Sequence, residues 1–167
     1  DPVIPFRDSR FYTHTELTVD PTATAIVGEM LLPGRVAHGE QHDYTLYASR
    51  LTARSPAGEL YFTDALELAP RRRPLHSPAR LGPHAVLATL HVVNFEVPGR
   101  ALADRLHARV AALPEVSGGA SELPNGAGAW ARVLGESSAA VSAALHAAWD
   151  EARRAVLGVP APDRRKT

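Results

Sequence analysis

Residues 9–70 read SRFYTHTELTVDPTATAIVGEMLLPGRVAHGEQHDYTLYASRLTARSPAGELYFTDALELAP, and side chains of opposite character alternate along most of this stretch. Near its start, Phe11 and Leu17 fall on one face of an extended chain, and His14 and Glu16 fall on the other. Alternation with a period of two residues indicates a half-buried β-strand. The stretch therefore predicts a run of short strands.

Turn signals divide this stretch into separate strands. Asp20-Pro21 ends the first strand, because proline cannot continue a strand ladder and restricts the residue before it. Residues 55–58, Ser-Pro-Ala-Gly, have the composition of a tight turn and predict a hairpin. We expect strands at residues 11–19, 23–27, 44–54, 60–68 and 86–97.

The pattern changes after residue 97. Apolar residues recur at helical spacing in residues 102–113, which predicts a first helix. Residues 118–128 are rich in small side chains and indicate a loop or a short hairpin, followed by a short strand at residues 129–134. A second helix is predicted from a serine N-cap within residues 135–138, Gly-Glu-Ser-Ser, to Gly158.

The order of strands, helix, strand and helix is not the regular alternation of a doubly wound α/β fold. We predict a mainly β fold of antiparallel strands with two C-terminal α-helices, in one domain spanning residues 1–167. The sheets can stack as a sandwich or as a β-helix-like spiral, and the sequence does not choose between them.

Composition limits the classes of partner. Lysine plus arginine and aspartate plus glutamate both number 18, so the chain lacks the basic excess that is typical of nucleic-acid-binding proteins. Two basic clusters, Arg71–Arg73 and Arg164–Lys166, are interpreted as solvated loop and tail. There is no cysteine, which excludes disulfides and thiolate metal sites. No apolar run reaches the roughly 20 residues of a membrane span, so we expect neither nucleic acid nor membrane as a partner.

The sequence contains no P-loop, no G-x-G-x-x-G, no G-x-S-x-G and no H-E-x-x-H. A candidate metal site is instead His38, Glu40 and His42, whose spacing of two would place all three side chains on one face of an extended strand. Imidazole and carboxylate ligands suit nickel, zinc or copper. The alternative is that these are exposed polar positions on a strand edge.

Asp64 falls on a strand face that is otherwise apolar. A buried carboxylate must be paired or hydrogen-bonded, or it becomes protonated. Two interpretations stay open: a structural partner such as Arg35, or a place in the polar lining of a cavity.

Several short runs, taken in order, resemble the UreD (UreH) family of urease accessory proteins. No single run is as specific as a P-loop, and their order and spacing across nearly the whole chain carry the resemblance. The runs are Ile4–Phe11, Thr15–Val19, Gly28-Glu29, Gly34-Arg35, Gly39-Glu40, Ser49–Leu51, Asp64–Leu66, Ala131–Gly135, Trp149 and Arg153-Arg154. The family has further N-terminal strands, so we expect this chain to be the latter part of a longer protein.

The resemblance implies a cytoplasmic maturation factor, or chaperone, without catalytic activity. Such proteins are scaffolds that bridge the UreF and UreG accessory proteins to the structural subunits of apo-urease, where nickel is inserted into the active site. The resemblance implies no tightly bound cofactor, only transient nickel. A nickel route through the protein body has been proposed for the family, and Glu29, Glu40 and Asp64 are the candidate lining residues here.

Two alternatives come from other classes. One is a β-sandwich hydrolase that uses Glu40 and Asp64 as an acid/base pair. The other is a carbohydrate-binding β module, against which the aromatic content of 6% argues.

The second predicted helix carries candidate partner contacts. Trp149, Arg153 and Arg154 belong to the residue types enriched at interface hot spots. The competing interpretation of Trp149 is that it belongs to the core.

Overall fold

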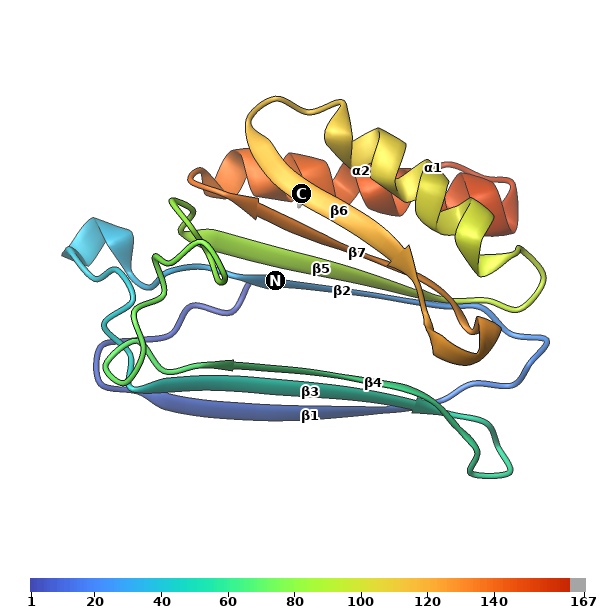
Figure 1. Cartoon of the computed structure of the whole chain (residues 1–167), viewed down its shortest axis with the longest axis horizontal. Coiled ribbons are helices and arrows are strands. Elements are labelled where there is room, and N and C mark those ends of the chain that lie inside the picture. The colour runs from blue at the N-terminus through green and yellow to red at the C-terminus, as the bar shows by residue number, and fades with distance from the viewer. Residues whose placement is uncertain (163–167) are drawn as a thin grey trace.

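The computed structural model describes residues 1–162 and shows two β-sheets stacked face to face, with two helices covering the outer face of one sheet (Figure 1). The first sheet has the strand order β1-β3-β4 and comprises β1 (Arg10–Thr18), β3 (Leu46–Arg54) and β4 (Leu60–Leu68). The second sheet has the order β2-β5-β7-β6 and comprises β2 (Ala25–Leu31), β5 (Val86–Val93), β7 (Gly128–Gly135) and β6 (Val116–Glu122). The helices are α1 (Gly99–Ala111) and α2 (Ser138–Leu157), and two short 3-10 turns are η1 (Val36–His38) and η2 (Pro124–Gly126).

These elements confirm the predicted mainly β fold with two helices, and the sheets stack as a sandwich. The basic cluster Arg164–Lys166 lies outside the described residues. Within residues 1–162, no helix is both long and apolar enough to cross a membrane.

One strand pair departs from the expected antiparallel arrangement. β1 and β3 run parallel, with Arg10 opposite Leu46 and Thr18 opposite Arg54. After β1 the chain crosses to the second sheet, forms β2, and then returns to the first sheet for β3 (Figure 1). A parallel neighbour needs such a long connection, whereas the tight turn between β3 and β4 gives an antiparallel hairpin.

Residues 116–122 form strand β6, which pairs antiparallel with β7 across the short turn η2. Of the loop or short hairpin predicted over residues 118–128, the hairpin is therefore confirmed, although its first strand begins earlier, at Val116. A small residue in β6 allows its neighbours to pack closely against this strand. A Cβ atom on Gly118 would lie 2.7 Å from both Val110 Cγ1 of α1 and the carbonyl oxygen of Arg132 in β7. The glycine therefore lets α1 lie close against the sheet.

The layer between the helices and the second sheet is apolar throughout. Leu102 and Leu106 of α1 and Val141 of α2 are completely buried against Val92 and Val133 of the sheet. The predicted serine cap of α2 is confirmed, because the Ser137 hydroxyl accepts a hydrogen bond from the backbone N–H of Ala140.

The layer between the two sheets is different. At one end it is filled by apolar side chains that include Leu51 and Phe62, and at the other end by a cluster that includes Tyr44 and Leu87. The residues between these two clusters are polar, and they form the candidate site.

Candidate functional site

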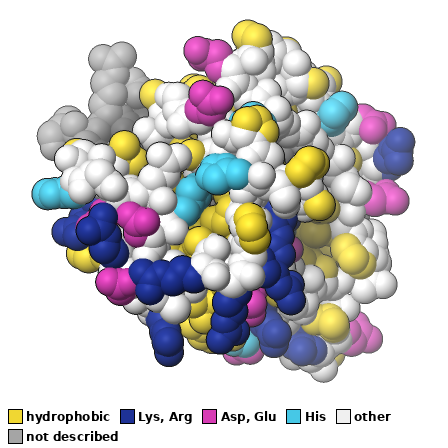
Figure 2. All heavy atoms as spheres, turned by 60° about the vertical axis from the view of Figure 1, so that its left-hand side comes forward, with side chains coloured by type: hydrophobic (Ala, Val, Ile, Leu, Met, Phe, Trp, Pro, Cys, Tyr) yellow, Lys and Arg dark blue, Asp and Glu magenta, His cyan; other side chains and the backbone are white. Residues whose placement is uncertain are grey.

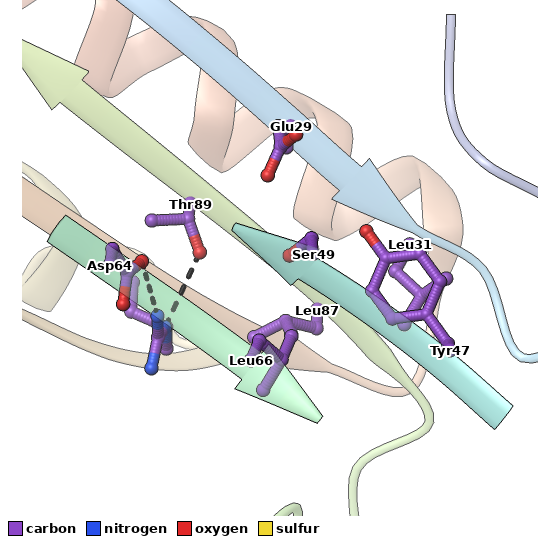
Figure 3. A pocket seen from close by; sticks show the side chains of 9 residues that line it. Glu29, Leu31, Tyr47, Ser49, Asp64, Leu66, Leu87 and Thr89 are labelled. Atoms are coloured by element: carbon purple, nitrogen blue, oxygen red, sulfur yellow. Dashed lines mark hydrogen bonds and ion pairs between the residues drawn. The ribbon is translucent and has the colours of Figure 1, made fainter. Parts of the chain in front are cut away.

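A band of polar side chains crosses the space between the sheets (Figure 3). We define this polar band as Glu29, Ser49, Asp64, Thr89, His91 and Arg132, which come from β2, β3, β4, β5 and β7. Strand register explains how they meet. Thr89 is opposite Glu29 on one side and opposite Arg132 on the other, so these three side chains form a row across the second sheet. Asp64 reaches this row from the first sheet.

Asp64 is the centre of the polar band. Its Oδ2 atom accepts hydrogen bonds from His91 Nε2 at 3.1 Å and from Arg132 Nη2 at 3.0 Å. Arg132 is itself oriented by its Nε atom, which donates to Thr89 Oγ1 at 3.3 Å. The hydrogen bond from His91, with help from the Arg132 charge, lowers the pKa of Asp64 against the opposing effect of burial. Asp64 is therefore ionised at neutral pH.

His91 is fixed in the sheet core by stacking. Its ring lies parallel to those of Phe62 and Trp130, with centroid distances of 5.6 and 6.5 Å. The side chain is 2% exposed, and its Nδ1 atom has no hydrogen-bond partner within residues 1–162. The guanidinium of Arg132 lies over the ring of Trp130, with its Cζ atom 4.9 Å from the ring centre. The Nε2 atom of the imidazole therefore binds Asp64, and its Nδ1 atom has no hydrogen-bond partner among the described residues.

A small cavity opens beside this cluster. Its polar lining is Glu29, Ser49, Asp64, Thr89 and Arg132, and Leu31, Tyr47, Leu66 and Leu87 complete the wall (Figure 3). The cavity measures about 20 Å³, which is room for one or two water molecules. Pockets for organic ligands are more than about tenfold larger. The polar band can therefore accommodate water, a proton or a small ion, but no organic substrate.

The structure settles the partner of Asp64. Both interpretations hold, because Asp64 has structural partners, His91 and Arg132, and also lines a cavity. Only the example given for the partner, Arg35, is wrong. Arg35 instead donates through Nε to Glu40 Oε2 at 2.9 Å. The sequence pattern of one strand cannot show which positively charged side chain of the opposite sheet contacts Asp64.

The segment that carries His38, Glu40 and His42 is not an extended strand, so the premise of a shared face is wrong. It forms the turn η1, continues through a left-handed Gly39, and reaches His42 at φ 57°. Glu40 is buried and accepts hydrogen bonds from Arg35 and from the backbone N–H of Arg7. In the described part of the chain, no three histidine or carboxylate side chains are placed to hold one metal ion.

The two carboxylates of the hydrolase alternative lie in separate clusters. Glu40 is not part of the cavity lining. The hydrogen bond from Arg35 lowers the pKa of Glu40, and the pKa of Asp64 is lowered as well. A general acid needs a raised pKa, so neither carboxylate is suited to that role.

The candidate partner residues lie toward the end of α2. Trp149 is half-buried and packs on the apolar core, and the guanidinium of Arg153 lies 5.6 Å from its ring centre. Arg153 Nε donates to the carbonyl oxygen of Pro160 at 3.1 Å, and Arg154 Nε donates to Asp150 at 2.8 Å. Trp149 thus belongs partly to the core, while both arginines stay near the surface.

Sequence reasoning missed His91 and Arg132. The sequence patterns assign no site role to His91, and they include Arg132 only within the run Ala131–Gly135 of the family resemblance. A usable signal was present, because both residues are polar and occupy strands whose other members are almost all apolar.

Comparison with known proteins identifies the family of this chain. A model of the UreD urease accessory protein family matches residues 1–167. The chain belongs to this family. The chain is 44% identical over 168 residues to urease accessory protein UreD 2 of Streptomyces griseus, which covers 99% of this chain and 57% of that protein.

Two further UreD proteins are similar to this chain over nearly its whole length. The chain is 40% identical over 166 residues to urease accessory protein UreD of Haloarcula marismortui, and 33% identical over 165 residues to that of Photorhabdus laumondii. These alignments cover 99% and 98% of this chain, and 55% and 51% of the relatives. The chain therefore spans about half the length of the curated UreD proteins it matches. All three relatives are named as urease accessory proteins.

Proposed function

We propose that this protein works in urease maturation as a non-catalytic scaffold, which bridges the UreF and UreG accessory proteins to apo-urease for nickel insertion. The observation that carries the proposal is the match of the UreD family model to the whole chain. The lowered pKa of both candidate acid/base carboxylates also supports a role without catalysis. We also propose a cytoplasmic location, which is consistent with membership of the urease accessory protein family.

Deleting the full-length gene tests this proposal. We expect urease subunits to be present at normal levels but to be inactive and poor in nickel, and the intact gene should restore both activity and nickel. Normal urease activity in the deletion strain under limiting nickel would contradict the proposed role.

We further propose that the polar band is a route for nickel or for its accompanying water. Glu29 and Asp64 line the same cavity and supply the oxygen atoms that a divalent cation accepts as ligands. Arg132 bonds to Asp64 and places a positive charge beside it, which opposes tight cation binding. A transient ion is therefore favoured over a resident one. Glu40 does not line the cavity, so the proposal is restricted to Glu29 and Asp64.

A further inference from the structure

Two histidines outside the polar band, His42 and His76, lie against each other at one end of the molecule. Their ring centres are 5.4 Å apart and their planes are inclined by 71°. His42 precedes β3, and His76 lies in the long loop between β4 and β5. The end that carries η1 and this loop is turned forward in Figure 2, where histidine side chains (cyan) lie above a row of arginines (dark blue).

In both rings the Nδ1 atom has a neighbour that orients the ring and leaves Nε2 for another ligand. His76 Nδ1 lies 3.1 Å from the carbonyl oxygen of Gly82, so in the neutral ring Nδ1 carries the proton and Nε2 keeps its lone pair. His42 Nδ1 lies 3.5 Å from the hydroxyl of Tyr44. The Nε2 atom of His42 is buried and has no hydrogen-bond partner within the described chain. Metal-binding histidines are typically oriented in this way, through the ring nitrogen that does not bind the metal.

The spacing of the rings also fits a shared ion. With metal–nitrogen bonds of about 2.0–2.1 Å, two imidazoles on one tetrahedral ion have ring centres about 5 Å apart.

Both histidines are held by the same part of the core. Tyr44, beside His42, is completely buried. Leu75 and Leu81, which bracket the His76 turn, are buried in the same apolar cluster as Tyr44, and the N–H of Leu81 donates to the carbonyl of Leu75 at 3.1 Å. The His76 side chain itself is exposed, so its ring can reorient without disturbing the core.

We propose that His42 and His76 form a two-histidine site for a divalent transition metal of the nickel, zinc or copper class. Water fills the remaining coordination positions on the exposed side. Of the predicted triad His38, Glu40 and His42, the site includes only His42. It goes beyond the scaffold role, because the argument for it uses the geometry of the two histidines and not the family membership. With only two protein ligands, the ion stays exchangeable.

Calorimetry with nickel chloride or zinc chloride, in a non-chelating buffer, tests the site on the full-length protein. The variants are His42→Asn, which keeps a residue that tolerates the left-handed backbone, and His76→Asn at an exposed position. The matched control is His38→Asn, an exposed histidine on the same segment as His42. Thermal midpoints measured without metal show whether each variant is folded.

We expect one ion per chain, an affinity that is lowered about tenfold or more by either His42→Asn or His76→Asn, and no change in His38→Asn. Zinc should also shift the ring NMR signals of both His42 and His76. Absence of binding to the wild type would overturn the proposal. Unchanged affinity in the folded His76→Asn variant, or an equal loss in His38→Asn, would overturn it as well. None of these readouts depends on urease.

Discussion

At the scale of single residues, Asp64 links the two sheets electrostatically. Its side chain is 33% exposed, and that of Arg132 is 32% exposed, so the pair is partly screened by solvent. His91 is almost fully buried and binds the same carboxylate oxygen. Removing the charge of Asp64 would leave two donors aimed at a weaker acceptor.

The Asp64→Asn variant should be less stable than the wild type by about 1–2 kcal/mol in the free energy of unfolding, because charge-assisted hydrogen bonds are lost at a half-buried site. Urea denaturation at neutral pH measures this difference. Glu67→Gln is the matched control, because Glu67 is an exposed residue of the same strand. Equal stability of Asp64→Asn and Glu67→Gln would show that the cluster contributes nothing to folding.

The pH dependence of this difference has a defined sign. The folded state holds the pKa of Asp64 below its ordinary value of 3.8, so the unfolded chain takes up the proton first as the pH falls. The stability that Asp64 contributes is therefore fully present above about pH 4 to 5, and it is lost as the pH falls through 3.8 toward the folded pKa. Urea titrations of the wild type and Asp64→Asn at several pH values should converge in acid. A gap that widens in acid would contradict this assignment.

At the scale of elements, the sequence predicted most of the strands and both helices. Local signals specified them, such as the alternation in residues 11–19, the Ser137 cap and the left-handed Gly158 at the end of α2. For residues 118–128 the sequence left a loop and a short hairpin open, because Gly118 and Gly119 resemble a loop, and the structure shows the hairpin of β6 and β7. The reason for Gly118 is the close approach of α1, which only the folded structure shows.

The two adjacent glycines of β6 give a test of that explanation. Gly118→Ala should destabilise the protein by about 1–3 kcal/mol, because its Cβ would lie 2.7 Å from Val110 of α1 and from a backbone oxygen of β7. Gly119→Ala is the control, since the nearest atom to its Cβ would be His107 Nδ1 at 3.9 Å. Thermal denaturation should separate the two variants. Similar midpoints would show that α1 can move away at little cost.

The end of α2 carries the proposed partner contacts. Replacing Arg153 and Arg154 by alanine should weaken capture of a UreF-type partner and leave the thermal midpoint nearly unchanged, because the Arg154 pair with Asp150 is a solvent-screened i,i+4 pair on the surface that contributes little to stability. Pull-down and thermal denaturation of the same variant test both parts. A lowered midpoint with intact capture would make these arginines structural.

At the scale of the whole molecule, the sequence predicted the fold class but not the site. Which face a residue occupies follows from alternation along one strand, and this correctly placed Asp64 on the inner face. The contacts of Asp64 with His91 and Arg132 depend on how two separate sheets are stacked, and no local pattern encodes that arrangement. The same limit explains why Glu40 was grouped with Asp64 although it is paired with Arg35.

The central claim is that the polar band between the sheets serves nickel insertion into urease. The most direct test is the nickel content of urease purified from a deletion strain that carries the full-length gene with Glu29→Gln, Asp64→Asn or the control Glu67→Gln. We predict nickel-poor urease with the first two variants and normal nickel with the control, while all three proteins accumulate to the wild-type level and capture their partners. Full nickel content with both Glu29→Gln and Asp64→Asn would contradict the claim.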